Sequence, residues 1–229
     1  MTVTATDVPN LSSVTSLALM FKNCFLANPN TSAWNTSNVT DMDGMFWDAS
    51  IANPDVSNWV TSNVTEMGDM FRDAFNANPN VTNWDVGNVI GMANLFAGSN
   101  ASPNVTNWDV SSCEDMRRLF GDTPGNPNVS NWDVSSVKKT GNMFKDATNA
   151  NPDCRNWNVI NLNDAGDMFD SSALSVENLT SIYENWSQLN LQQNVAFSAG
   201  NTKYNASGQA GKDILVNTYN WLITDGSQV

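Results

Sequence analysis

The chain has 229 residues, a formal net charge of −13 and no histidine. The acidic balance excludes nucleic acid and anionic membrane surfaces as partners, because both require a basic footprint. Histidine is the commonest general base and metal ligand, and no phosphate-binding loop or Ser-His-Asp arrangement is present, so we expect no enzyme, no cofactor and no metal site. Calcium stays open only as a minor alternative, since no segment matches a calcium-binding loop.

Residues 1–9 carry no repeat signal, and we expect them to form an N-terminal lead-in. They lack the basic segment and long apolar segment of a signal peptide. No apolar run of about 18 residues occurs in the chain, so we expect no membrane insertion.

Residues 10–172 repeat one pattern with a period of 24 or 25 residues. One column of the aligned copies is tryptophan: Trp34, Trp59, Trp84, Trp108, Trp132 and Trp157. A second column is phenylalanine: Phe21, Phe46, Phe71, Phe96, Phe120, Phe144 and Phe169. A fixed period in this range predicts a solenoid of stacked coils, here about six full coils preceded by a half unit.

Each repeat divides into two halves with different apolar spacing. In the first half, Val81, Trp84 and Val86 follow the apolar skeleton of a leucine-rich repeat and predict a short strand. In the second half, apolar residues recur at helical spacing, as in Val39, Met42 and Phe46. The predicted fold class is therefore α/β: a right-handed leucine-rich-repeat-like solenoid with one short strand and one short helix per coil.

The repeat also resembles a known family. The segment Asn131-Trp-Asp-Val-Ser-Ser-Val137, followed by Met143-Phe144, resembles the BspA-type leucine-rich-repeat surface proteins. The resemblance covers about residues 10–172, with departures from its pattern at Val60, Thr140 and Ala165. It implies a surface protein used for attachment and carries over no catalytic residue.

Residues 173–229 leave the repeat and are predicted to cap the open end of the solenoid with a small α/β segment. Ser175 is a plausible N-cap for a helix ending near Gln188. A strand at 195–198, a helix at 210–216 and a strand at 221–224 are expected to follow.

The repeats place two polar ladders beside the tryptophan column, and these are the candidate ligand-binding residues. Asn83, Asn107 and Asn131 precede tryptophan, and Asp85, Asp109 and Asp133 follow it. Stacked asparagines can instead form hydrogen bonds with one another. Stacked like charges repel one another unless an oppositely charged partner lies nearby. Trp47 is a further candidate, because it stands in a column of mixed, solvent-facing residues.

The three cysteines, Cys24, Cys113 and Cys154, occupy small-residue and valine columns and are predicted to be core residues. They lie several coils apart, which is too far for a disulfide.

These features predict a non-catalytic recognition or adhesion module that binds a host-surface glycan or protein through the strand face. The alternative is a structural spacer or decoration component of a fibre or virion that contacts neighbouring subunits. Either function places the protein outside the cell, on a cell surface or on a virion surface.

Overall fold

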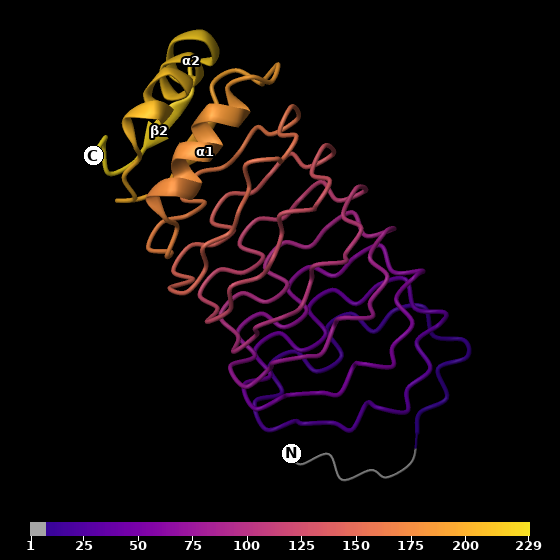
Figure 1. The fold of residues 1–229 in the computed structure, drawn as a ribbon. Coiled ribbons are helices and arrows are strands. Elements are labelled where there is room, and N and C mark those ends of the chain that lie inside the picture. Colours follow the sequence, from indigo (N-terminus) through magenta and orange to yellow (C-terminus); the bar gives the residue numbers. More distant parts are fainter. Residues whose placement is uncertain (1–7) are drawn as a thin grey trace.

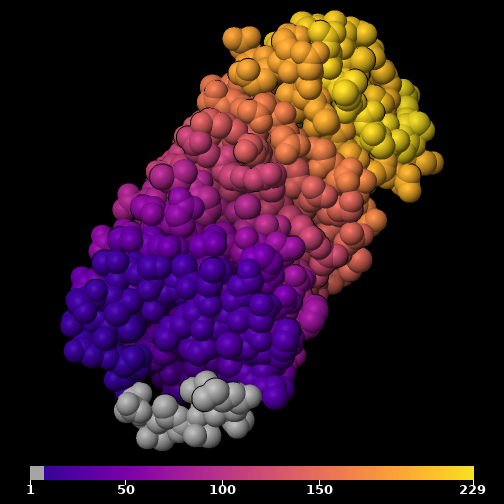
Figure 2. Space-filling model, turned by 180° about the vertical axis from the view of Figure 1, so that it is seen from behind, coloured from indigo at the N-terminus to yellow at the C-terminus, as the bar shows by residue number. Residues whose placement is uncertain are grey.

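The computed structural model describes residues 8–229, so most of the predicted lead-in over residues 1–9 lies outside the described part of the chain. The repeats wind into coils stacked along one long axis, and a compact helical segment closes the C-terminal end (Figure 1). The body is elongated, with the first coils and the C-terminal residues at opposite ends (Figure 2).

The predicted leucine-rich-repeat-like α/β solenoid is wrong. Between residues 8 and 172 the chain forms turns and isolated bridges, and no helix or multi-residue strand occurs there. One parallel bridge joins each coil to the next, through a bridge column made of Ser16, Asp41, Glu66, Gly91, Asp115, Lys139 and Asp164. Both α-helices and both strands lie in the C-terminal segment.

The expected helix fails because the backbone of each coil turns left-handed at regular intervals. Positive φ angles recur at Leu19, Gly44, Asp69, Asn94, Arg118, Asn142 and Asp167, and again four residues beyond each of these. Most of these positions hold Asn, Asp or Gly, which tolerate positive φ better than other residues. Two left-handed residues, four positions apart in each coil, interrupt an α-helix before it completes a turn.

The amide groups that a helix would use internally instead join neighbouring coils. The N–H groups of Met42, Gly44 and Phe46 donate to carbonyl oxygens of the next coil at 2.8–3.0 Å. The intervening N–H of Met45 donates back to the Met42 carbonyl and closes a tight turn. Every second amide therefore binds coil to coil, which satisfies the backbone without a helix or a continuous strand.

The apolar columns form the core, as predicted. Val39, Met42, Met45 and Phe46 are fully buried, like most of their counterparts in later coils. Phenylalanine rings of successive coils stack with centroids 5.3–6.0 Å apart. Cys113 and Cys154 are buried as predicted, but the prediction is wrong for Cys24, which is exposed.

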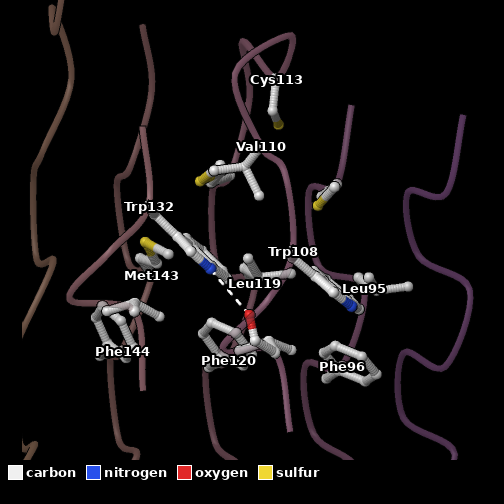
Figure 3. Packing of buried hydrophobic residues seen from close by; sticks show 14 of the residues in the cluster. Leu95, Phe96, Trp108, Val110, Cys113, Leu119, Phe120, Trp132, Met143 and Phe144 are labelled. Atoms are coloured by element: carbon white, nitrogen blue, oxygen red, sulfur yellow. Dashed lines mark hydrogen bonds between the residues drawn. The ribbon is translucent and has the colours of Figure 1, made fainter. Parts of the chain in front are cut away.

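The tryptophan side chains join neighbouring coils by ring stacking and by hydrogen bonds. Neighbouring tryptophan rings lie nearly parallel at 6.2–6.5 Å, and the indole N–H of Trp132 donates to the Val105 carbonyl of the preceding coil at 3.0 Å (Figure 3). The same hydrogen bond to a carbonyl of the preceding coil is made by Trp59, Trp84, Trp108 and Trp157. A buried indole needs such an acceptor, so each tryptophan adds apolar area and also joins two coils.

The C-terminal elements agree with those expected from the sequence. Helix α1 spans Val176–Trp186, and the Ser175 side chain caps it by accepting the N–H of Asn178. Strands β1 (Ala196–Ser198) and β2 (Leu222–Thr224) pair in parallel. The short 3₁₀ helix η1 (Ala206–Gly208) leads into helix α2 (Gln209–Tyr219) between these strands.

The C-terminal segment continues the columns of the stack. The indole N–H of Trp186 in α1 donates to the Cys154 carbonyl at 3.0 Å, as the tryptophan of a further coil would do. Phe197 in β1 packs edge-on against Phe169 at 6.1 Å, and a parallel bridge joins it to Ala165. The core of the last coil is therefore covered by aromatic groups from outside the repeat.

Candidate functional site

The three predicted aspartates lie exposed at the surface, each at the start of a tight turn. The carboxylates of Asp85, Asp109 and Asp133 accept backbone N–H groups two residues ahead at 3.0–3.1 Å. The Ser111 hydroxyl also donates to Asp109 at 2.7 Å, and these hydrogen bonds hold the pKa of that carboxyl below its ordinary value. The aspartates thus stabilise local turns, a role that accounts for their repetition.

The predicted asparagines Asn83, Asn107 and Asn131 are also exposed, and within residues 8–229 their side chains make no hydrogen bond. The amide ladder that joins the coils lies in a different column, immediately before the repeated valine. Its members donate to a carbonyl of the preceding coil at 2.7–2.8 Å: Asn38, Asn63, Asn88 and Asn161.

Trp47 is half-buried and is covered by cations from both neighbouring coils. The Lys22 ammonium lies 3.4 Å from the ring centroid, and the Arg72 guanidinium lies 4.7 Å from it. A cation over an indole face is attractive, and it occupies the surface on which a ligand would stack. The structure therefore gives Trp47 a contact within the stack, apart from the groove described next.

A shallow groove crosses three successive coils beside the valine column. It encloses about 510 Å³ and is lined by Asn63, Thr65, Asn88, Ile90, Ser112 and Glu114. A second hollow of about 290 Å³ shares Ile90 and Glu114 with it and extends the surface over Lys138 and Lys139. We call this continuous surface the intercoil groove.

The backbone fixes the floor of the intercoil groove. The N–H groups of Ile90, Glu114 and Lys138 each donate to the preceding coil at 2.9 Å, forming a ladder along the stack. Asn63 and Asn88 each use one amide hydrogen to reach the preceding coil, which leaves the amide oxygen for other partners. The groove is therefore preformed, with its polar side chains held at the spacing of the coils.

The groove combines an apolar centre with polar walls. Ile90 is 47% exposed at its middle, between the amides of Asn63 and Asn88 and the carboxylate of Glu114. The Lys138 ammonium pairs with Glu114 at 2.6 Å. Amide, hydroxyl and carboxylate groups around an apolar centre suit a neutral ligand with many hydroxyl groups.

Glu66 and Asp115 both line the second hollow, but their electrostatic environments differ. Burial, with Asp43 and Asp41 nearby, raises the pKa of Glu66, which makes no ion pair within residues 8–229. Burial opposes a lower pKa for Asp115, but two-point hydrogen bonding from Arg117 at 2.6–3.1 Å lowers that pKa below its ordinary value. The hollow therefore contains one carboxylate without an ion pair, Glu66, beside two that are paired with cations, Glu114 and Asp115.

Sequence reasoning missed the groove, although a signal for it existed. The column after the repeated valine changes chemistry from coil to coil: Thr40, Thr65, Ile90, Glu114, Lys138 and Asn163. Stacking fixes the buried columns, and a variable exposed column beside them is free to match a ligand.

No helix within residues 8–229 has the length and apolarity needed to cross a membrane. The same residues contain no group of three or more acidic, cysteine or histidine side chains placed to hold a metal ion.

Comparison with known proteins identifies a family. No curated protein and no solved structure matches the chain. The family described as "Mycoplasma protein of unknown function, DUF285" matches it twice, over residues 2–104 and 92–209. The two matches together span most of the chain, and the chain therefore belongs to the DUF285 family.

Proposed function

We propose that the chain is a non-catalytic recognition module that binds an extended glycan along the intercoil groove. The observation that carries the proposal is the groove itself, a preformed surface across several coils with an apolar centre at Ile90 and amide, hydroxyl and carboxylate groups around it. The groove crosses three successive coils, so a chain-like ligand can contact several coils in succession. The resemblance to BspA-type surface proteins supports the same function and an extracellular, cell-surface or virion-surface location.

The test compares two surfaces of the same protein on a glycan array. The Ile90→Asn and Glu114→Gln double variant changes the groove, and asparagine already stands in the Ile90 column at Asn163. The matched variant changes Asp85, Asp109 and Asp133 to asparagine, away from the groove. Glu114 forms an exposed ion pair, which contributes little to stability, so both proteins should fold.

We expect the groove variant to lose about tenfold or more in affinity, roughly the effect of one or two removed contacts. The aspartate variant should keep the affinity of the native chain. The reverse result would return the site to the predicted aspartate ladder. Binding unaffected by either variant, or glycoside turnover by the pure protein, would contradict the proposal.

A structural role as a spacer or decoration component is the second candidate. The observation that favours it is the exposed apolar surface at the N-terminal end of the stack, which is suited to contact with another subunit. Electron microscopy of the purified chain would show assembled particles or fibres if this role were dominant.

A further inference from the structure

A polar hollow lies where the last coil meets the C-terminal segment. It encloses about 450 Å³ and shares no lining residue with the intercoil groove. One wall belongs to the turn after Phe169, and the other belongs mainly to the turn that follows β1. The polar residues and the glycine that line it are Asp170, Ser171, Gly200, Asn201, Thr202 and Thr224. We call this space the junction hollow.

One column of backbone amides changes its hydrogen bonding at the junction hollow. In the earlier coils, the N–H two residues after the repeated phenylalanine donates to a carbonyl of the next coil at 2.8–2.9 Å. These donors are Asn23, Asp48, Asp73, Gly98, Asp122 and Asp146. Ser171 is the next member of the column, and its N–H has no hydrogen-bond partner within residues 8–229. The junction hollow therefore contains a backbone donor that is open to a further partner.

This donor stays open because the C-terminal segment follows a different path from a coil. Its Ser198 carbonyl still accepts the N–H of Phe169 at 3.1 Å, but the chain then forms a turn at Gly200, where φ is +57°. A Cβ at Gly200 would lie 3.2 Å from the Asp170 Cα and 3.5 Å from the Ser171 nitrogen. A side chain at this position would therefore enter the space between the two walls, and glycine keeps that space open.

The side chains add further hydrogen-bonding capacity to the junction hollow. One carboxylate oxygen of Asp170 accepts the Ser198 hydroxyl, and the other oxygen has no partner among the described residues. Four more polar side chains of the hollow form no hydrogen bond within residues 8–229: Ser171, Asn201, Thr202 and Thr224. Together these groups offer both donors and acceptors within one small volume.

This mixture of groups favours a neutral ligand with several hydroxyl groups. The Asp170 carboxylate repels anions, and a lone carboxylate lacks the several charged oxygen ligands that calcium prefers. A sugar hydroxyl, in contrast, can donate to the carboxylate and accept from the Ser171 N–H. The volume lies within the range of about 300–1,000 Å³ that is usual for small-molecule sites.

We propose that the junction hollow binds a monosaccharide unit between the last coil and the C-terminal segment. Asp170 accepts hydroxyl hydrogens of the sugar, and the Ser171 N–H donates to one of its oxygens. Asn201, Thr202 and Thr224 complete the contacts from the second wall. The site is separate from the intercoil groove, so either site can bind without the other. A ligand that contacts both walls binds the folded chain alone and should raise its melting temperature.

A titration of the full chain with the methyl glycosides of glucose, galactose and mannose tests the proposal. Two-dimensional NMR follows each backbone amide during the titration. We expect saturable shifts at Ser171, Asn201 and Thr202 with at least one of the three sugars. Saturable shifts limited to Ile90 and Glu114 would assign the sugar to the intercoil groove and overturn the proposal. The absence of saturable shifts with all three sugars would also overturn it.

Two variants of the hollow and one control sharpen the test. Asp170→Asn removes the charge but keeps an oxygen for the Ser198 hydroxyl, so it should fold and bind the sugar about tenfold or more weakly. Thr202→Val removes one hydroxyl at nearly constant shape and should weaken binding by about threefold. Asp146→Asn changes an exposed carboxylate of the preceding coil outside the hollow and should leave the affinity unchanged. Equal loss in Asp170→Asn and Asp146→Asn would show an effect of net charge and contradict the proposal.

A charged probe separates a sugar site from a cation site. Methylammonium carries a positive charge and no hydroxyl group, so a hollow that binds through the charge of Asp170 alone would take it up. We expect methylammonium chloride to give no saturable shift at Ser171. A shift as large and as saturable as that caused by the sugars would identify a cation site and overturn the proposal.

Discussion

The two ends of the stack differ in how the apolar face of the terminal coil is covered. At the C-terminal end, helix α1 and strand β1 supply Trp186 and Phe197, which take the places of the next tryptophan and phenylalanine. At the N-terminal end, the described chain leaves Met20 47% exposed, whereas its counterparts Met45 and Met70 are fully buried. A repeat that buries its apolar face only against a neighbour needs a different sequence wherever the neighbours stop.

The largest expected effect comes from removing the aromatic cover of the last coil. Trp186→Ala deletes a fully buried indole that contacts Phe197 and Trp221. We expect a loss of about 3–5 kcal/mol in the free energy of unfolding, measured by urea denaturation. The control Leu222→Ala, at an exposed site of the same segment, should change it by less than about 0.5 kcal/mol. A loss below about 1 kcal/mol for Trp186→Ala would show that the C-terminal segment does not stabilise the stack.

An intermediate effect should separate inner coils from the first one. Trp108→Phe removes the N–H that reaches the Val81 carbonyl at 3.2 Å, although that carbonyl keeps the backbone N–H of Trp84 at 3.0 Å. Trp34→Phe loses similar ring volume but no hydrogen bond to a described residue. Because one hydrogen bond contributes about 0.5–1.5 kcal/mol, Trp108→Phe should be more destabilising than Trp34→Phe by about that amount. Equal losses in urea denaturation would mean that ring packing alone holds the column.

The smallest effect concerns the pH dependence of stability, which should have opposite signs in the repeats and in the C-terminal segment. Burial, with Asp69 and Asp41 nearby, raises the pKa of Asp43, and Glu66 is raised for similar reasons. Their contribution to stability is complete below their ordinary values of 3.8 and 4.5 and is lost as the pH rises through the folded pKa. Glu66→Gln should therefore raise the melting temperature at pH 7 by about 1–2 °C and have no effect below about pH 4.

The C-terminal segment should respond in the other direction. Burial opposes ionisation of Asp225, but the Lys212 ammonium at 2.8 Å and the Tyr183 hydroxyl at 2.6 Å lower its pKa below the ordinary value. Its contribution is present above about pH 4 and is lost as the pH falls through the lower folded pKa. Calorimetry from pH 3 to 7 measures both responses, and a Glu66→Gln gain that persisted at pH 3 would contradict the assigned cause.

The sequence predicted burial well and backbone shape poorly. The spacing of Val39, Met42 and Phe46 reports which side chains face the core, and those residues are buried. The same spacing arises in a coil of tight turns, so it cannot distinguish that coil from a helix. The distinguishing signal was a pair of Gly, Asp or Asn residues four positions apart in most coils, as at Gly44 and Asp48, where φ is positive.

The C-terminal elements were easier to predict because local signals determine them. Ser175 caps α1 through its own side chain, and the helix follows from ordinary periodicity. The intercoil groove was harder, because its residues come from different repeats and meet only when the coils stack. The aspartates after tryptophan were predicted to bind a ligand because they repeat. Their repetition instead reflects the turn that each of them stabilises.

Hydrogen exchange of the backbone amides most directly tests the contrast between the two ends. Residues 17–27 should exchange faster than residues 67–77 and the C-terminal segment, because among the described residues the first coil has a neighbour on one side only. Protection of residues 17–27 that equals the protection of residues 67–77 would contradict this contrast between the two ends.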